Sequence, residues 1–421
     1  YLCAMMQQPD IIVIGAGPAG LLAAGTAACE QRRVWLLEKM EKPARKLRIT
    51  GKGRCNITNT KPWDDFEIHV FPVARRFKPA FMNFPNTALI RFMEQQGVPV
   101  VVERGGRVFP ASSQAQDVAE ALVHWAQSKN VYVRCKTEAL RLVTEGGKVT
   151  AVEARANGRL HTWRAGAFII ATGGLSYPAT GATGDGFRWA EATGHTVTPP
   201  YPSLVALETA NHPAALNGLA LRNVSLTLFI EGRAVDEAFG EMAFTADGVD
   251  GPVVLRLSHK AVGALRQNKK VMLELNCKPA LSGGQIQARL QREIATFAGQ
   301  PLSVLLRKWL PEQFVQPFLE KTKLPPKKKT AQLNAQDVEQ LVAALHSWKM
   351  DVSGYGGYER AVITAGGVSM QDIDHKTMRS RKMENLFFAG ETLDLYADTG
   401  GYNLQIAFST GYLAGKSAAK I

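Results

Sequence analysis

Three glycines near the start of the chain have the spacing that phosphate binding requires. Gly15, Gly17 and Gly20 form a GxGxxG pattern directly after the apolar run 11–14. In this pattern the first glycine allows a tight turn, the second lets the backbone approach a pyrophosphate, and the third lets a helix pack closely on a strand. A helix that begins at Pro18 would then direct its positive N-terminal end at the phosphates.

A carboxylate lies where the ribose of a nucleotide would need it. Glu38 follows the apolar run 34–37 and is 18 residues beyond Gly20. A carboxylate at this place accepts hydrogen bonds from the ribose hydroxyls and repels a 2′-phosphate. Glycine turns alone are common, but here a strand, a helix, a second strand and an acidic residue follow one another at the spacing of a nucleotide-binding unit. The segment 10–38 therefore predicts a nucleotide-binding βαβ unit.

This first motif fits FAD and NAD equally, and two later segments favour FAD. The segments 169–174 and 387–391 each read as a strand that ends in small residues. Small residues at such a place suit close approach of the backbone to a flat or anionic ligand. After the second segment, Gly400 and Gly401 form a turn that opens a helix. The N-terminus of that helix could face the edge of a flavin ring, where negative charge accumulates on reduction. The alternative is an ordinary tight loop between a strand and a helix.

The segment 45–56 mixes cations with glycines and ends in Arg54, Cys55 and Asn56. Such a loop can bind phosphates or a carboxylate through backbone N–H and guanidinium groups; the alternative is a basic surface loop.

The sequence contains no second GxGxxG. We therefore expect no second dinucleotide domain, and a nicotinamide reductant, NAD(P)H, would have to reach the flavin through a shared pocket.

Composition narrows the class of protein. The 421 residues, 46% hydrophobic and 21% charged, predict a soluble globular protein of two or three domains. No apolar run reaches the roughly 18 residues that span a bilayer, and residues 1–8 lack the features of a signal peptide. The five cysteines include no CxxC pair, which speaks against a metal site or a dithiol relay. We expect a cytoplasmic protein with no membrane segment and no bound metal.

The chain carries a formal net charge of +13. Such an excess raises the local concentration of anionic partners. Two interpretations stay open: general solubility with attraction for an anionic cofactor, or a nucleic-acid substrate. The compact basic run 321–329 contains two prolines and is typical of a solvated linker.

The elements around these motifs predict a discontinuous nucleotide domain. Helical and strand patterns lead up to 167–171, a continuous apolar run typical of a buried parallel strand. From Pro199 the pattern changes to antiparallel strands and then to helices, and it returns to βαβ character near Arg360. The simplest layout is an α/β fold with a nucleotide domain at 1–198 and 353–421, a β-rich insert at 199–280 and a helical insert at 281–352.

Several motifs together resemble the BaiN/RdsA family of NAD(P)/FAD-dependent oxidoreductases, also described as YhiN-type flavoproteins. The resemblance covers nearly the whole chain, and its GRCN and GGYN motifs are specific. It implies a Rossmann-like FAD-binding domain interrupted by a β-barrel-like subdomain and a helical subdomain. The motifs are GAGPAG at 15–20, RKLRITGKGRCNITN at 45–59, ATGGLSYPATGATGDG at 171–186, ITAGGVS at 363–369 and FAGETLDLYADTGGYNLQIAFSTG at 388–411.

The resemblance also implies which residues bind FAD. The first motif and the strand after it hold the ADP half, the loop 45–56 lies near the pyrophosphate and the flavin, and the later motifs contact the ring. The residues so implied are Gly15, Gly17, Pro18, Ala19, Gly20, Glu38, Lys39, Lys46, Gly53, Arg54, Cys55, Asn56, Ala139, Thr172, Gly173, Gly174, Gly390, Glu391, Gly401, Tyr402, Asn403 and Leu404.

One segment departs from the family pattern. Members often read FT(H or D)xGxSGP, whereas this chain has Ala246 at the polar position and Asp250 in place of the serine. The resemblance therefore carries no ligand contact over to these two positions.

Family activities resemble flavin-mediated hydride transfer to or from carbon. They include reduction of uridine to dihydrouridine in large-subunit ribosomal RNA, reduction of conjugated double bonds in bile acids, and oxidation of small amines. Because of the positive charge we expect the RNA substrate, whose target base must be flipped or single-stranded to reach the flavin. The alternatives are a small-molecule enone reductase or amine oxidase, and a flavoprotein that binds RNA without catalysis.

Reduction of an activated C=C bond also needs a proton on the neighbouring carbon. Cys55 is the first candidate donor, followed by Tyr177 and Tyr402. The cations Lys52 and Arg54 are expected to lower the pKa of the Cys55 thiol. The alternative is that Cys55 only packs beside the cofactor.

Overall fold

The structure, a computed structural model, describes residues 8–210 and 212–421. Cys3 and nearly all of the segment examined for a signal peptide lie outside the described residues. The chain divides into two compact units. The first unit comprises Tyr1–Pro202 and Ala361–Ile421, and the second comprises Ser203–Arg360.

A seven-stranded, mostly parallel sheet forms the centre of the first unit. Its middle strands consist wholly of buried apolar residues, as expected of parallel strands covered on both faces. β1 pairs in parallel with β2 and with β11. The expected α/β fold with a Rossmann-like βαβ unit is confirmed. Across the sheet the strands are β20 (Ile373–Asp374), β21 (Arg379–Ser380), β22 (Leu386–Phe388), β11 (Ala167–Ile170), β1 (Ile11–Ile14), β2 (Val34–Leu37) and β7 (Tyr132–Arg134).

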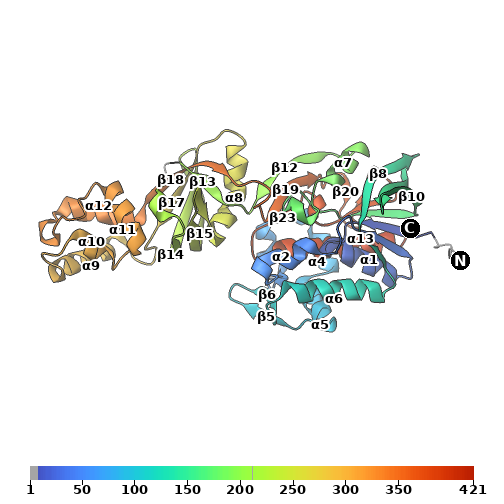
Figure 1. The fold of residues 1–421 in the computed structure, drawn as a ribbon, viewed down its shortest axis with the longest axis horizontal. Helices are drawn as coiled ribbons and strands as arrows, with labels where there is room; N and C mark the ends of the chain where they lie inside the picture. The colour runs from blue at the N-terminus through green and yellow to red at the C-terminus, as the bar shows by residue number, and fades with distance from the viewer. Residues whose placement is uncertain (1–7, 211) are drawn as a thin grey trace. The chain divides into compact units, whose positions relative to one another are not determined.

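Two helices from opposite ends of the chain pack against each other in the first unit (Figure 1). They are α1 (Pro18–Cys29) and α13 (Tyr402–Ala418). Their backbones approach closely because α13 presents a glycine at the contact: a Cβ on Gly411 would lie only 2.3 Å from the carbonyl oxygen of Ala19. The first and the last motif of the sequence are therefore held together by backbone contact.

Smaller elements surround the sheet and carry the loops of the motifs. β3, β6 and β5 form one small sheet, β10, β9 and β8 a second, and β4 pairs with β23. The helices are α2 (Arg45–Ile49), α3 (Trp63–Phe66), α4 (Lys78–Asn83), α5 (Asn86–Gln95), α6 (Ala115–Ser128) and α7 (Asp185–Ala192), with short 3-10 turns η1 (Thr50–Gly53), η2 (Glu67–His69), η3 (Ala74–Arg76), η4 (Pro178–Thr180) and η7 (Gly390–Thr392). The strands are β3 (Thr58–Asn59), β4 (Val70–Phe71), β5 (Val100–Glu103), β6 (Arg107–Pro110), β8 (Thr137–Glu145), β9 (Lys148–Ala156), β10 (Arg159–Arg164), β12 (Val197–Ser203), β19 (Ile363–Val368) and β23 (Tyr396–Ala397).

Six strands of the second unit close into a barrel in the order β13-β16-β15-β14-β17-β18. Every second residue of β17 is buried, as in a strand with one face toward the core. The helices α9 to α12 are inserted between β17 and β18, which are neighbours in the barrel. The expected barrel-like and helical subdomains are confirmed. The elements are β13 (Leu207–Thr209), η5 (Ala214–Leu216), β14 (Ala220–Ile230), β15 (Arg233–Phe244), β16 (Gly248–Asp250), α8 (Pro252–Leu265), β17 (Val271–Asn276), α9 (Gly283–Thr296), α10 (Leu302–Leu306), α11 (Glu312–Thr322), η6 (Thr330–Gln332), α12 (Ala335–His346) and β18 (Trp348–Tyr355).

The basic run 321–329 departs from the solvated linker that the sequence indicated at its start, where Lys321 and Thr322 belong to α11, while Lys323, Lys327 and Lys329 are exposed. The ammonium of Lys321 donates a hydrogen bond to the carbonyl of Lys349 at 2.8 Å, and it lies 4.1 Å from the ring centre of Trp348. Burial lowers the pKa of Lys321. A lysine stem can cover apolar surface while its charged end finds a partner, so this part of the run belongs to the packed helical subdomain.

Candidate functional site

The turn before α1 leaves open space where the pyrophosphate is expected. Gly15 and Gly20 are required by the fold, since Cβ atoms there would lie 2.4 Å from the Ala171 oxygen and 1.8 Å from the Gly15 oxygen. Gly17 differs, because a Cβ on it would meet no atom within 4 Å. It is the N-cap of α1 and provides no capping side chain, and the first turn, Pro18 included, carries no acid. The first-turn N–H groups and the space before them fit the phosphates of FAD.

Glu38 lies directly after β2, as predicted, and its carboxylate closes the glycine turn. Oε2 accepts a hydrogen bond from Ala16 N at 2.9 Å, and Oε1 accepts one from Met40 N at 2.8 Å. Burial raises the pKa of Glu38 although both backbone donors oppose that shift. Each carboxylate oxygen keeps a further lone pair, so a ribose hydroxyl can still donate to Glu38.

Lys39 fastens the glycine-rich loop 181–186 to the end of β2. Its ammonium lies 2.7 Å from Asp185 Oδ2, and both side chains are largely covered. Ala139 is buried on β8, a strand that begins beside the carbonyl of Glu38. The structure thus brings three of the residues implied for FAD binding, Glu38, Lys39 and Ala139, together near the end of β2.

A buried ionic network joins three motifs that are far apart in the sequence. Lys46 Nζ lies 2.8 Å from Glu391 Oε2 and 2.5 Å from Ser176 Oγ. Ser176 Oγ donates to Glu391 Oε1 at 2.8 Å, and Thr364 N donates to the same oxygen at 2.6 Å. Burial by itself would raise the pKa of Glu391, but the Lys46 charge and these hydrogen bonds outweigh it and lower the pKa. Lys46 and Glu391 therefore lock the motifs together.

The small residues after β11 and β22 lie next to one another. Thr172 Oγ1 is 3.5 Å from Thr392 Oγ1. Gly173 and Gly390 have φ angles of 76° and 70°, a conformation that favours glycine. A Cβ on Gly173 would have a single neighbour within 4 Å, whereas one on Gly174 would lie 2.4 Å from a threonine hydroxyl. The backbone at Gly173 is therefore open to a ligand, and Gly174 is required by packing.

The turn before α13 is interlocked with the segment that follows the 45–56 loop. Gly401 has a φ of 95°, and a Cβ on it would lie 2.3 Å from the carbonyl oxygen of Thr58. The Asn56 amide, oriented to satisfy both of its ends, accepts from Gly401 N at 3.1 Å and donates to Thr58 O at 3.0 Å. Asn403 holds the other side through two 2.8 Å bonds to the main chain of β23, and Leu404 is half-buried in the first turn of α13. Asn56 and Asn403 thus shape the turn itself.

The loop 50–55 forms a tight backbone curve. Residues 51–53 and Cys55 all have positive φ angles. Successive N–H groups in such a curve make a concave site for an anion. A Cβ on Gly53 would meet no atom within 4 Å, so the backbone here also leaves room for a ligand.

The prediction that neighbouring cations lower the pKa of Cys55 is wrong. Arg54 pairs with Glu103 Oε1 at 2.5 Å, and its guanidinium lies 4.3 Å from the ring centre of Phe109. Cys55 is fully buried, and burial raises its pKa to about 12 against a weaker effect of its hydrogen bond with Thr50. A thiol without exposed surface does not reach a substrate. The geometry favours the alternative, in which Cys55 packs beneath the loop.

The two candidate tyrosines differ in their surroundings. Tyr402 is 3% exposed, and its ring stacks on His69 with the ring centres 4.4 Å apart. Burial, reinforced by nearby carboxylates such as Asp398, raises the pKa of the Tyr402 hydroxyl. Tyr177 is half-buried, has a left-handed φ of 54° and opens the turn 178–180. Both tyrosines therefore stay predictions as proton donors.

Sequence reasoning missed a polar chain beside Tyr402. His69 Nδ1 lies 2.8 Å from Asp398 Oδ2, and His69 Nε2 lies 2.9 Å from Lys61 Nζ. The pairing of β4 with β23 brings His69 and Asp398 together although 329 residues separate them. Both strands are two residues long, so no hydrophobic pattern could have indicated the contact. The one feature of the sequence that could have drawn attention to this pair is the position of Asp398 just before the Gly400 turn.

The two positions that depart from the family pattern have local roles in the second unit. Ala246 is exposed in the turn between β15 and β16. Asp250 Oδ1 accepts a hydrogen bond from Gly251 N at 2.7 Å, next to the start of α8. An aspartate near a helix N-terminus is favourable, which explains how this residue is accommodated here.

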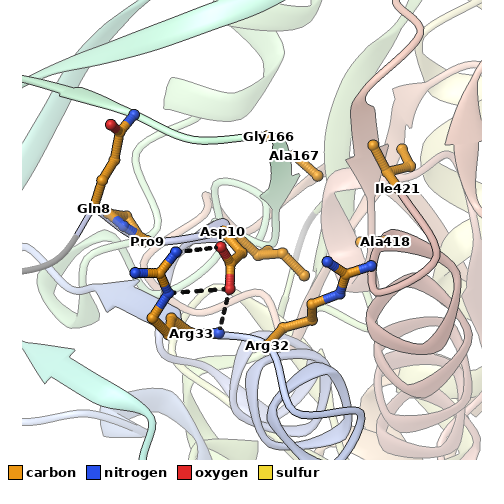
Figure 2. A pocket seen from close by; sticks show the side chains of 10 residues that line it. Gln8, Pro9, Asp10, Arg32, Arg33, Gly166, Ala167, Ala418 and Ile421 are labelled. Atoms are coloured by element: carbon orange, nitrogen blue, oxygen red, sulfur yellow. Dashed lines mark hydrogen bonds and ion pairs between the residues drawn. The ribbon is translucent and has the colours of Figure 1, made fainter.

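A separate hollow of about 300 Å³ lies at the opposite edge of the sheet, where β1 and β11 begin (Figure 2). Arg33 Nη2 pairs there with Asp10 Oδ1 at 2.8 Å, and Arg32 Nε donates to the carbonyl of Ala419 at 2.7 Å. Ligands of open α/β sheets bind at the carboxyl ends of the strands. The hollow in Figure 2 is therefore not the nucleotide site.

The described residues contain no group of three or more His, Cys, Asp or Glu side chains that could hold a metal ion. No helix formed by residues 8–210 or 212–421 combines the length and the apolar character needed to cross a bilayer.

Comparison with known proteins agrees with the Rossmann-type fold. The profile of the family described as HI0933-like protein Rossmann domain matches residues 9–417. The chain is 30% identical to the ribosomal RNA dihydrouridine synthase of Escherichia coli over 97% of either chain. It is 28% identical to the 3-dehydro-bile acid delta(4,6)-reductase of Clostridium scindens over 97% of this chain and 98% of that protein.

A solved structure extends the likeness to the fold. The 3-ketosteroid delta1-dehydrogenase of Sterolibacterium denitrificans matches with a TM-score of 0.55 and 13% identity, over 99% of this chain and 100% of that one. At this identity the likeness concerns the fold alone. The fold described above is thus shared with this dehydrogenase over nearly the whole chain.

Proposed function

The chain belongs to the HI0933-like family, the BaiN/RdsA family of FAD-dependent oxidoreductases, and from that premise we propose that it reduces uridine to dihydrouridine in large-subunit ribosomal RNA. NAD(P)H is the proposed reductant. The reaction adds a hydride to one carbon of the uracil C=C bond and a proton to its neighbour. The charge distribution of the chain carries the choice of RNA over a small molecule.

More than half of the net charge lies in one segment that contains the 45–56 loop. Residues 45–110 hold twelve Lys and Arg against five Asp and Glu, a net of +7 out of +13 for the whole chain. The same segment carries exposed apolar side chains, among them Ile68 at 66% and Val102 at 59% exposure. Clustered cations that can neutralise phosphates suit an RNA substrate. A steroid or a small amine offers no matching array of charges.

The candidate site fits FAD from end to end. The open space at Gly17 and the α1 N-terminus would hold the pyrophosphate, with Glu38 on the ribose. The backbone at Gly173 and the turn at Gly401 would hold the ring, with the α13 N-terminus toward the edge that becomes negative. Bound FAD supplies the hydride chemistry. The chain's own task is to fix this ring beside a basic surface where a flipped base can dock.

The decisive experiment is a dihydrouridine map of large-subunit RNA from a strain that lacks the gene. We expect one dihydrouridine position to disappear, and to return with the wild-type gene but not with Gly17→Ala. Gly263→Ala serves as the matched control, because a Cβ on Gly263 also meets no atom within 4 Å and lies outside the cofactor site. An unchanged map in the deletion strain would overturn the proposal.

Reduction of a conjugated steroid ketone is the second candidate. The relative named for that reaction covers as much of the chain as the relative named for the RNA reaction. Purified protein with NAD(P)H distinguishes the two: an RNA substrate gives rates that fall steeply with salt, whereas a steroid gives rates nearly independent of salt. A flavoprotein that only binds RNA would oxidise no NAD(P)H with either substrate.

A further inference from the structure

We propose that His69, held between Lys61 and Asp398, takes up a proton when the flavin is reduced and gives it up when the substrate is reduced. The inference rests on the proposed function, since it requires a flavin that cycles between oxidised and reduced states. His69 thus stores the proton that accompanies the hydride.

The contacts of His69 make a continuous polar chain with one buried and one accessible end. Asp398 is 7% exposed and accepts from the Nδ1 side of the ring at 2.8 Å. The main chain strengthens this contact, because Asp398 N donates to His69 O at 3.0 Å. Lys61 is half-buried and lies 2.9 Å from Nε2 on the other side. An imidazole between a carboxylate and an ammonium can exchange its proton in either direction.

Asp398 has capacity to stabilise a positive His69. Its Oδ1 atom is buried and makes no hydrogen bond with any described residue. One carboxylate oxygen therefore serves His69 alone, while the other has no donor to neutralise it. The charge of Asp398 therefore lies directly beside the His69 ring with no other described donor on either carboxylate oxygen.

The chain lies where reduction of the flavin would be felt. The His69 ring stacks on Tyr402, the first residue of α13, with ring centres 4.4 Å apart and planes 23° apart. The α13 N-terminus is the proposed place of the ring edge that becomes negative. Negative charge there raises the tendency of nearby bases to bind protons. Among the described residues, the titratable groups that contact His69 are Lys61, Asp398 and Tyr402.

The atoms balance over one cycle. Bound FAD would supply the hydride chemistry with NAD(P)H as reductant, and a solvent proton would add to His69 Nε2 in place of the hydrogen bond with Lys61. On reduction of the C=C bond the hydride goes to one carbon, the N–H bond of the His69 imidazolium breaks, and a C–H bond forms on the neighbouring carbon. The ring returns to its neutral form with Nδ1 toward Asp398.

The test counts protons and does not need a substrate. Holoprotein is reduced anaerobically in weak buffer near pH 7 with an indicator dye, and the protons taken up per flavin are measured. We expect His69→Gln to take up about one proton fewer than the wild-type protein. His161→Gln is the matched control, because His161 stacks on Trp163 and has no carboxylate partner among the described residues. Equal uptake by wild type and His69→Gln would overturn the inference.

A second measurement uses only the unmodified protein. Histidine ¹⁵N spectra of the oxidised and the reduced holoprotein report the protonation of the eight histidines. We expect one of them to change from neutral to protonated, and a spectrum in which none changes overturns the inference even if His69→Gln does not fold. If the wild-type protein takes up the expected proton but does not reduce uridine in RNA, that result contradicts the proposed function and not this inference.

Discussion

The two glycine turns that open α1 and α13 resemble each other in sequence and differ in what makes glycine necessary. At Gly17 the backbone is extended and a Cβ would meet nothing within 4 Å, so the protein itself does not require glycine. At Gly401 the φ angle is 95° and a Cβ would collide with Thr58. The first turn leaves open space, whereas the second is determined by the fold. A glycine before a helix can therefore report either cofactor contact or packing.

Gly401→Ala has the largest expected effect in this comparison. The Cβ would lie 2.3 Å from a backbone oxygen, which cannot move aside as a flexible side chain can. Together with the cost of a positive φ, we expect the free energy of unfolding to fall by more than about 3 kcal/mol, measured by urea denaturation of the apoprotein. The control is Gly97→Ala, with a φ of 79° and no neighbour within 4 Å, which should cost only about 1 kcal/mol. Equal losses in both variants would show that the clash is relieved at no cost.

Gly17→Ala should show the reverse behaviour. The methyl group would occupy the space before α1, so we expect FAD affinity to fall about 100-fold, measured by flavin fluorescence titration. Stability of the apoprotein should change by less than about 1 kcal/mol, since the side chain meets no protein atom. Gly263→Ala should leave FAD affinity unchanged and, because Gly263 lies inside α8, should raise the stability by up to about 1 kcal/mol. Normal FAD affinity in Gly17→Ala would place the pyrophosphate elsewhere.

The sequence predicted the first turn better than the second, for a physical reason. Local periodicity gives β1, α1 and β2, and the glycine spacing gives the turn between them. The contacts of Gly401 with Asn56 and Thr58 join segments from opposite ends of the chain. No single-sequence pattern encodes such pairs.

The chemistry of individual side chains was least predictable. Neighbours in sequence suggested that Arg54 would activate Cys55, but Arg54 pairs with Glu103 and the thiol is buried. His69 and Asp398 meet only because two very short strands pair. A side chain's pKa depends on burial and on partners distant in sequence, which is why motif spacing does not determine it.

The two motif carboxylates extend the comparison to pH. The pKa of Glu391 is lowered in the folded state, so its ion pair stabilises the protein above the ordinary glutamate pKa of 4.5 and loses its effect as the pH falls through the lower folded value. The pKa of Glu38 is raised by burial, so its ionisation costs stability, and this cost disappears as the pH falls through the raised value. We expect the stability of the apoprotein, measured from pH 7 to pH 3, to fall less steeply in Glu391→Gln than in wild type and more steeply in Glu38→Gln. A change in slope of the same sign in both variants, relative to wild type, would contradict the opposite roles of these residues.

Breaking the Lys46–Glu391 pair from its other side sharpens the same point. Lys46→Met leaves the buried carboxylate without its cation, and we expect a loss of about 2 kcal/mol at pH 7. In Lys46→Met with Glu391→Gln the uncompensated charge is gone, so part of that loss should be recovered. A double variant less stable than Lys46→Met would mean that hydrogen bonds of Glu391 to Ser176 and Thr364 matter more than its charge.

The smallest expected effect concerns Cys55, which lies in the 50–55 loop. Because its pKa is raised to about 12 and it has no exposed surface, a thiol reagent at pH 8 should leave it unmodified in the folded protein. Cys29 is exposed and is the internal control, expected to react within minutes. Peptide mapping by mass spectrometry reads both sites from one sample, and urea should make both react. Rapid labelling of Cys55 in the native protein would show that the 50–55 loop opens, and would restore this thiol as a candidate proton donor.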